Sequence, residues 1–401
     1  MNHLRYIMKS ILFCLRFNIT DNRPYAVRVL TIAKIYRELG YQVIFICVDN
    51  TNLQREFTHT NYCGFECYTI HFFKTRNPLK LFKTKRFVKQ QFSTIMKIIK
   101  EKGAEIHSII ALLMYDLIAN FSRKYARKNK IHFIYITTEW YLYHSFYGRF
   151  IWLKYLVAVY MRNIKAKKTN IMVISRFLAN FYQTKKHCHV SLIPSIVDQN
   201  DYANNEMNHQ ARKSGKIRIM YAGYPGKKDV IHTFFQAILS LSEEEKRKIA
   251  FYGYGFEEKD LVSLGLSVEE IRQSGCIFIC GQVSQQEVKE ALNISDFSIL
   301  IRQDTLNAKG GFSTKIVESM MAGVPIIGNL TGDMELYFND KNSVILSNPS
   351  LEECKKALKK VLMMSDLEIE EMKKAAHQTA IQSFDYHLYL ETMRKFMEEL
   401  K

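Results

Sequence analysis

The sequence predicts an α/β protein with two doubly wound parallel sheets. Short apolar runs alternate with helical stretches in both halves of the 401-residue chain, which is the pattern of strand–helix–strand units. The length allows two domains of ordinary size. A polar stretch over 199–216 contains few apolar residues and is the expected linker. We therefore expect a first domain over 1–198 and a second domain over 217–383.

The first domain is predicted to open with a strand, a helix and a second strand. An apolar run within 5–17 gives the first strand, and 43–48 gives the second. Pro24 marks the start of the helix between them and Gly40 marks its end. A unit of this kind begins a doubly wound parallel sheet.

Residues 78–102 form a basic amphipathic stretch. Val88, Phe92, Ile95 and Ile99 recur at helical spacing, so one helix or a pair of helices is expected. The functional interpretation is docking on a membrane surface. The alternative, which we favour for the apolar stripe, is an ordinary helix that covers the sheet and keeps its basic face in water.

Two further units are expected over 107–119 and 131–138, and the second ends at Glu139. A carboxylate at the carboxyl end of a parallel strand points into the crevice where such folds bind ligands, so Glu139 is the leading site residue of the first domain. The alternative is a glutamate that only compensates a helix dipole. Residues 141–168 mix aromatic and basic side chains. They suit an interfacial surface or a grip on a polyprenyl chain, or equally an aromatic-rich buried helix.

The second domain is predicted to open with a strand that runs to Gly223, followed by a helix whose front carries Lys227, Lys228 and Asp229. The Gly-x-Gly turn at 253–255 lacks the rest of a dinucleotide fingerprint, so we reject a Rossmann dehydrogenase.

Further along the second half, a Ser-x-x-Glu pattern and an arginine at a strand end each have their own interpretation. Ser284 and Glu287 have the spacing of a capping box, which needs no function. Arg302 closes a strand, where it either contacts a diphosphate or lies on the surface.

The most informative stretch is 309–329, which reads KGGFSTKIVESMMAGVPIIGN. It predicts a glycine loop, a helix that Gly323 ends, and a strand that starts after Pro325. A helix N-terminus offers unpaired N–H groups and positive dipole charge, which suit a phosphate. With Lys315 in the first turn and Glu318 one turn further on, the stretch suits a nucleotide sugar. The alternative is a plain loop–helix–strand of an α/β protein.

This stretch resembles the donor-binding motif of the retaining family 4 glycosyltransferases of the GT-B fold. Glu318 matches the second glutamate of their Glu-x7-Glu pattern, whereas Gly310 occupies the place of the first. The Gly-Phe-Ser-Thr-Lys run over 311–315 is similar to that of a capsule and surface-polysaccharide subgroup. The resemblance covers nearly the whole chain. It implies two Rossmann-like domains facing a cleft (GT-B), with a C-terminal helix over 384–401 that returns to the first domain.

The resemblance also implies site residues. Relatives place a phosphate-binding lysine where Lys228 lies, and often an arginine where Tyr224 lies. We expect catalysis to depend on Glu139, Lys228 and Lys315. The expected donor-binding residues are Gly223, Gln282, Val283, Arg302, Gly311, Phe312, Ser313, Thr314 and Glu318. The expected acceptor-side residues are Asn22, Arg23 and Tyr25.

The implied reaction is sugar transfer from a nucleoside diphosphate sugar with retention. Preorganised donors at the leaving diphosphate contribute about 3–4 kcal/mol each in other enzymes. The family works without a bound metal, and no Asp-x-Asp motif lies in a suitable place, so we expect neither metal nor cofactor. A sugar-nucleotide epimerase or a phosphorylase of the same fold is the alternative.

Charge is distributed unevenly along the chain. Residues 1–200 carry a formal charge of +22 and residues 201–401 carry −4, so one domain is expected to face an anionic partner. No nucleic-acid motif is visible, which makes a nucleic-acid binder the remote alternative. We expect a polyprenyl-diphosphate-linked saccharide acceptor and an anionic membrane surface. No signal peptide or 18-residue uncharged run is present, and the eight cysteines are scattered. The expected location is cytoplasmic, peripheral at the inner face of the membrane.

Overall fold

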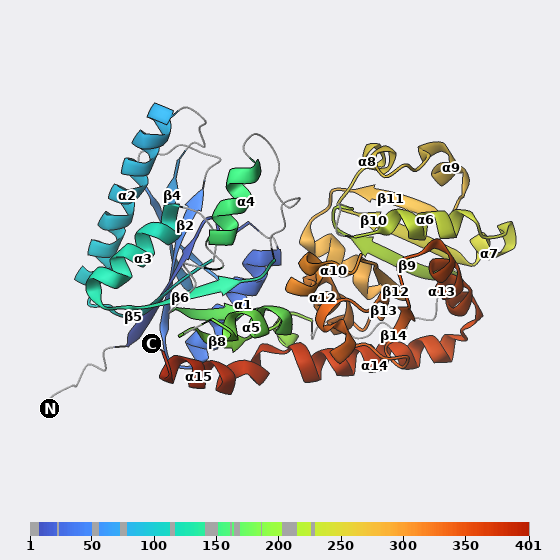
Figure 1. Ribbon diagram of the computed structural model, residues 1–401. Helices are drawn as coiled ribbons and strands as arrows, with labels where there is room; N and C mark the ends of the chain where they lie inside the picture. The colour runs from blue at the N-terminus through green and yellow to red at the C-terminus, as the bar shows by residue number, and fades with distance from the viewer. Residues whose placement is uncertain are drawn as a thin grey trace. The chain divides into compact units, whose positions relative to one another are not determined.

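Two parallel sheets organise the chain (Figure 1). A computed structural model describes residues 8–21, 24–49, 56–72, 78–112, 117–140, 151–160, 163, 169–185, 187–202, 215–225 and 229–400. The first unit comprises residues 1–194 together with 389–401, and the second comprises residues 195–388. Most of the predicted linker, 203–214, lies outside the described residues.

The first unit contains an eight-stranded sheet in the order β3-β4-β2-β1-β5-β6-β7-β8. All neighbouring strands are parallel except β3 and β4. The strands are β1 (Lys9–Leu15), β2 (Gln42–Asp49), β3 (Thr58–Tyr62), β4 (Phe65–His71), β5 (Glu105–Leu112), β6 (His132–Thr137), β7 (Asn170–Val173) and β8 (His189–Leu192). The helices are α1 (Pro24–Glu38), α2 (Pro78–Glu101), α3 (Leu117–Asn129), α4 (Ile151–Tyr160), α5 (Arg176–Gln183) and α15 (Leu390–Glu398).

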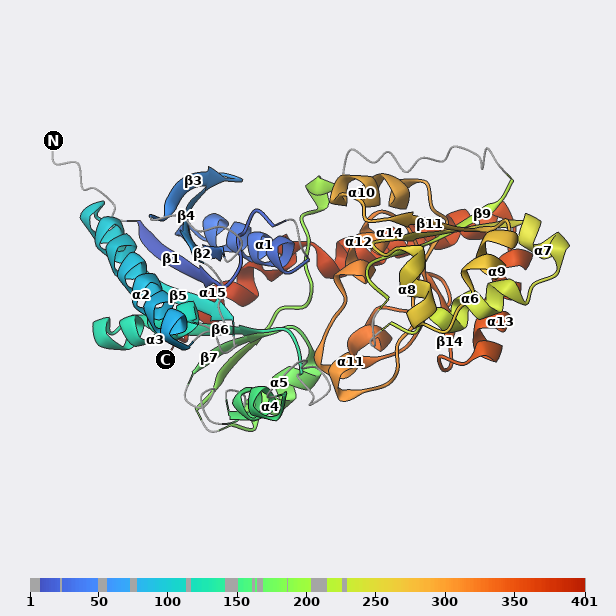
Figure 2. The same cartoon turned by 90° about the horizontal axis from the view of Figure 1, so that it is seen from above.

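Helices cover both faces of this sheet, as Figure 2 shows for α1 on one face and α2 with α3 on the other. Alternation along β1 explains the arrangement. Leu12 packs with the residues of α2 and α3, whereas the ring of Phe13 meets Tyr36 of α1 at 5.9 Å between centroids. Strands buried on both faces read as continuous apolar runs, which is why the alternation of strands and helices was visible in the sequence.

The antiparallel β3–β4 hairpin was absent from the sequence prediction. Its two-residue turn is Cys63-Gly64, with φ of 51° and 77°. Positive φ at both positions matches the right-handed twist of the flanking strands. The prediction failed because β3 is largely polar and exposed, and because Cys-Gly is not among the usual hairpin dipeptides.

Helix α2 is a single helix, and its predicted apolar stripe covers the sheet. Val88, Phe92, Ile95 and Ile99 are all buried against β-strand residues, while Lys97 and other basic side chains remain exposed. The sheet-covering interpretation is therefore confirmed for the apolar face.

The predicted return of the C-terminal helix is also confirmed. Helix α15 packs in the first unit against α1 and β8. The ring of Phe396 stacks on His189 of β8, with 4.8 Å between centroids and 8° between planes. The first unit is therefore built from two distant segments of the chain.

The second unit contains a six-stranded parallel sheet in the order β11-β10-β9-β12-β13-β14. Its strands are β9 (Ile217–Ala222), β10 (Ile249–Tyr254), β11 (Ile277–Gly281), β12 (Phe297–Leu300), β13 (Ile326–Asn329) and β14 (Ser343–Leu346). Its helices are α6 (Ile231–Leu239), α7 (Glu243–Arg247), α8 (Glu258–Ser263), α9 (Val268–Gln273), α10 (Gln285–Asn293), α11 (Leu306–Gly310), α12 (Thr314–Met321), α13 (Leu351–Met363) and α14 (Asp366–Phe384). The order reverses between β9 and β12, which makes this place the switch point where open α/β sheets bind ligands.

Local signals set several boundaries of the second unit as predicted. Ser284 and Glu287 form the capping box of α10, with both reciprocal hydrogen bonds present. Gly323 follows α12 with φ of 72°, the left-handed conformation that suits a residue ending a helix. Within the described residues, no helix has the length and apolar content needed to cross a membrane. The eight cysteines, all described, form no disulfide.

We predict that Ile95→Ala lowers the free energy of unfolding by about 2–4 kcal/mol, because truncating a fully buried side chain leaves a cavity. Lys97→Ala on the exposed face of the same helix should stay within about 0.5 kcal/mol of the unmodified protein. Urea unfolding followed by circular dichroism measures both. Equal effects of the two substitutions would contradict the sheet-covering role of α2.

Candidate functional site

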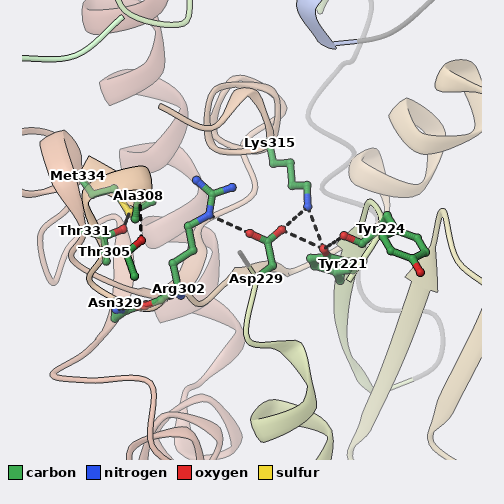
Figure 3. A network of polar contacts seen from close by, with 10 residues as sticks. All are labelled: Tyr221, Tyr224, Asp229, Arg302, Thr305, Ala308, Lys315, Asn329, Thr331 and Met334. Atoms are coloured by element: carbon green, nitrogen blue, oxygen red, sulfur yellow. Dashed lines mark hydrogen bonds and ion pairs between the residues drawn. The ribbon is translucent and has the colours of Figure 1, made fainter. Parts of the chain in front are cut away.

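A buried ion-pair network lies at the carboxyl ends of β9 and β12, at the switch point of the second sheet (Figure 3). Asp229 comes from the connection between β9 and α6, Arg302 follows β12, and Lys315 is the second residue of α12. These three charged side chains point toward one another from three separate elements. The sheet order brings them together, because β9 and β12 are neighbours although far apart in sequence.

Asp229 is the centre of this network and is 7% exposed. Its Oδ1 accepts a hydrogen bond from Arg302 Nε at 2.8 Å. Its Oδ2 accepts one from Lys315 Nζ at 2.6 Å and one from the Tyr221 hydroxyl at 2.9 Å. One carboxylate between two cations leaves one net positive charge at the carboxyl edge of the sheet.

Protonation states in the network follow from burial and from the neighbouring charges. Burial opposes ionisation of Asp229, but the charges of Lys315 and Arg302 outweigh it and hold the pKa of the carboxyl well below its usual value. Burial lowers the pKa of Lys315, and the charge of Asp229 opposes that shift. Burial, and then Asp229, raise the pKa of Tyr221 well above its usual value, so its hydroxyl stays a donor.

The backbone around Arg302 is fixed by Asn329 at the end of β13. Asn329 Oδ1 accepts from Arg302 N and Asn329 Nδ2 donates to Arg302 O, both at 2.8 Å. Asp229 and Arg302 also form an isolated antiparallel bridge. The guanidinium is therefore held by both its main chain and its Nε.

Gly223 lets Lys315 reach this network. Its φ of 141° lies outside the range that side chains favour, and a Cβ there would lie 2.5 Å from Lys315 Nζ. The neighbouring Tyr224 is 61% exposed, and its carbonyl oxygen lies 3.1 Å from the Tyr221 hydroxyl, as a second acceptor for the proton that points to Asp229.

The predicted glycine loop before α12 needs correction. Gly310 is the last residue of the short helix α11, and Gly311 is extended with φ of −110°. Neither glycine therefore adopts the left-handed conformation that would require a glycine. The prediction was wrong for Gly310, because it ends a helix that Thr305 caps by accepting a hydrogen bond from Ala308 N at 3.2 Å. Gly311 does lie in the loop between α11 and α12.

The start of α12 matches the predicted helix. Ser313 is its N-cap residue and makes no side-chain cap hydrogen bond, and Thr314 is half-buried at the first helical position. Phe312 directs its ring between Tyr337 and Phe384, at 5.4 and 5.7 Å between centroids. The ring thus anchors the segment, and the Phe312 carbonyl oxygen accepts a hydrogen bond from Ser195 Oγ at 3.3 Å.

Glu318 lies one turn beyond Lys315 on α12. Burial raises the pKa of its carboxyl to about 7, although Lys289 and Lys315 act in the opposite direction. Lys289 Nζ lies over the ring of Tyr202, 5.0 Å from its centroid. Glu318 is therefore a partly buried carboxyl that titrates near neutrality.

The remaining donor-site predictions fall on the loop after β11. Gln282 is exposed and donates from Nε2 to the Gly255 carbonyl at 2.8 Å, and Val283 beside it is half-buried. Together with Gly223, Arg302, Lys315 and Glu318, they lie on loops and a helix that follow strands of one sheet.

The predicted residues of the first unit are only partly described. Asn22 and Arg23 lie outside the described residues, as does Lys228 of the second unit. The ring of Tyr25 packs on Phe17, with 4.3 Å between centroids. Glu139 is half-buried just after β6. The adjacent Trp140 packs edge-to-face on Phe177 and Phe181 of α5.

Sequence reasoning missed the roles of Asp229, Tyr221 and Asn329. Asp229 was noted only as part of a charged helix front, and Asn329 only as the last residue of the stretch 309–329. The available signal was their position, since each lies at or just beyond the carboxyl end of a parallel strand, where ligand sites gather.

The two Rossmann-like units define the GT-B type of fold, and similar solved structures share it. Sucrose-phosphate synthase from Thermosynechococcus elongatus matches with a TM-score of 0.74 and 11% identity, over 98% of this chain and 99% of that one. Anabaena HepE, solved with UDP and glucose, matches with a TM-score of 0.66 and 13% identity, over 98% and 100%. A glycosyltransferase from Rickettsia africae matches with a TM-score of 0.65 and 15% identity, over 98% and 99%.

Residues 203–380 match the sequence model of the family described as glycosyl transferases group 1. The second unit therefore carries a group 1 glycosyltransferase domain, and the ion-pair network lies inside it. A search of curated proteins found no match to the chain.

We predict that Glu318→Gln changes how stability depends on pH. In the folded protein the carboxyl has a pKa of about 7 against 4.5 for an ordinary glutamate. The folded state thus binds a proton that the unfolded chain releases, and the free energy of unfolding falls as pH rises between these values. From pH 5 to pH 8 the wild type should therefore lose about 2 kcal/mol of its free energy of unfolding. The variant, which has no carboxyl to titrate at this position, should not show that loss. Urea unfolding at both pH values measures this.

The matched control for that experiment is Glu290→Gln, at an exposed position of α10. It should leave the difference between pH 5 and pH 8 as in the wild type. A stability difference for Glu318→Gln that does not depend on pH would contradict the raised pKa.

Proposed function

We propose that the protein is a retaining, metal-independent glycosyltransferase. It would move a sugar from a nucleoside diphosphate sugar to a lipid-linked or saccharide acceptor in surface polysaccharide biosynthesis. The observation that carries the proposal is the net positive Asp229–Lys315–Arg302 network beside the N-terminus of α12. A diphosphate is the group of such donors that a positively charged switch point and a helix N-terminus attract.

Charge development explains how these groups would act in the reaction. The bond between the anomeric carbon and the diphosphate oxygen breaks while the acceptor oxygen bonds to the same carbon, and the acceptor proton passes to the leaving phosphate. Negative charge grows on the diphosphate, where Lys315, Lys228 and the N–H groups of α12 would stabilise it. Because Lys315 and the start of α12 are already oriented, they need no rearrangement during the step.

Other residues would bind the rest of the donor and the acceptor. Glu318 would accept hydrogen bonds from the ribose hydroxyls, and the chain at Gln282 and Val283 would meet the base. Glu139 would orient the acceptor hydroxyl or support the positive sugar ring. Because Anabaena HepE was solved with UDP and glucose, UDP and its sugars are the first ligands to test.

We predict that Lys315→Met weakens binding of UDP at least tenfold, about 1.4 kcal/mol, because the site loses a cation that faces the phosphates. Isothermal titration calorimetry with UDP measures the loss. Lys246→Met, which removes a lysine paired with Glu243 at 2.8 Å on α7, is the control and should bind like the wild type.

Product analysis decides the reaction class in the same preparation. Labelled UDP-sugar with an acceptor should yield a labelled saccharide. The amount of UDP released should equal the amount of that saccharide. An altered sugar nucleotide without acceptor would indicate an epimerase, and a sugar phosphate would indicate a phosphorylase. Absence of binding to every nucleoside diphosphate tested would overturn the proposal.

The membrane part of the proposal concerns α4. Only 151–160 and 163 of the predicted aromatic and basic stretch are described. Trp152, Leu153 and Leu156 of α4 are 54%, 47% and 52% exposed, and the sequence around them belongs to the basic half of the chain. Exposed apolar side chains among basic residues favour the surface of an anionic bilayer.

We predict that Leu156→Glu weakens co-sedimentation with vesicles containing phosphatidylserine about tenfold, because it places a carboxylate on the inserting face. Met363→Glu changes an 85% exposed side chain in the second unit and should leave co-sedimentation unaltered. If the wild-type protein does not co-sediment with anionic vesicles, the proposed membrane association is wrong. The proposed sugar transfer does not depend on that result.

A further inference from the structure

We propose that Asp229 is a positioning residue whose carboxylate is a permanent counter-ion of the donor site. It would keep Lys315 protonated and hold Lys315 and Arg302 in place for a diphosphate, instead of being displaced by that ligand. The inference rests on the proposed function, because it assumes that the site receives a nucleoside diphosphate.

The hydrogen bonds that the Asp229 carboxylate accepts argue against its replacement by a ligand. Asp229 is 7% exposed, and its two oxygens accept from Arg302, Lys315 and Tyr221 at 2.6 to 2.9 Å. A ligand that took over these donors would leave a buried carboxylate without partners, which is strongly unfavourable. The carboxylate therefore belongs to the site before and after binding.

Both cations retain donors for a ligand. A lysine ammonium carries three N–H groups, and Lys315 uses two of them, toward Asp229 and Tyr221. Arg302 uses Nε toward Asp229. No hydrogen bond to its Nη atoms occurs within the described part of the chain, and Figure 3 shows them directed away from the carboxylate. A guanidinium with two free NH₂ groups suits phosphate oxygens.

The charges around Lys315 explain why it needs this counter-ion. Burial and, after it, Arg302 favour loss of its proton, whereas Asp229 and Glu318 favour keeping it. Tyr221 contributes a neutral hydroxyl at 3.0 Å. Of the two carboxyls, only Asp229 makes a direct ion pair with it. Removing that charge would leave two cations facing each other in a buried place, and the lysine is the one that can become neutral.

The test compares binding of UDP to Asp229→Asn and to the wild type between pH 7 and pH 9, by calorimetry. The variant should bind more weakly at pH 7, and the ratio of its Kd to that of the wild type should grow about tenfold by pH 9, as neutral Lys315 accumulates. Using the ratio at each pH cancels the titration of UDP, which is the same in both measurements. Asp296→Asn is the matched control, because Asp296 is a buried carboxylate at the opposite edge of the same strands that accepts from Arg218 N at 2.8 Å. Its ratio should stay flat.

Several outcomes would overturn the inference. A constant ratio for Asp229→Asn would assign the residue a merely structural role, and tighter binding would make it a competitor of the phosphates. Wild type that binds no nucleoside diphosphate would instead overturn the proposed function. A second measurement does not need Asp229→Asn to fold. The ¹³C resonance of Lys315 Cε in the wild type, assigned by its loss in Lys315→Arg, reports whether Lys315 is protonated. A neutral Lys315 at pH 8 would overturn the counter-ion role.

Discussion

A buried carboxylate between two cations fixes the functional edge of the second unit. Asp229 forms ion pairs with Lys315 from a helix and with Arg302 from the end of a strand, and removing its charge would leave two cations facing each other in a buried place. The glycine at 223, the amide of Asn329 and the bridge between residues 229 and 302 all serve this arrangement. The charge of the candidate site and the positions of its charged side chains therefore have one common origin.

Sequence reasoning succeeded where the determinants are local. Pro24 and Gly40 bound α1, Gly323 and Pro325 separate α12 from β13, and the serine and glutamate of the capping box start α10, because each acts within a few residues of itself. The parallel sheets followed from apolar runs in strands buried on both faces. The same reasoning failed for the polar strand β3. It also failed for Gly310, which is the last residue of a helix that a threonine caps.

The central contact could not be predicted in this way. Asp229 and Arg302 are 73 residues apart in sequence, and only the order of the strands makes them neighbours. Periodicity describes which residues face a core, but it does not tell which strands adjoin. The sequence shows a charged residue after each of two predicted strands, Asp229 and Arg302. Only the strand order shows that these two side chains form an ion pair. Sites built at the switch point of a sheet share this property.

The packing of α15 in the first unit has a consequence for synthesis. Residues 389–401 complete that unit, and the whole second unit lies between them and Pro194 in the chain. During translation the ribosome must therefore produce the entire second unit before His189 can acquire its stacking partner Phe396. The first unit emerges first but can complete its packing only last, so the parts of α1 and β8 that α15 covers stay uncovered on the nascent chain until then.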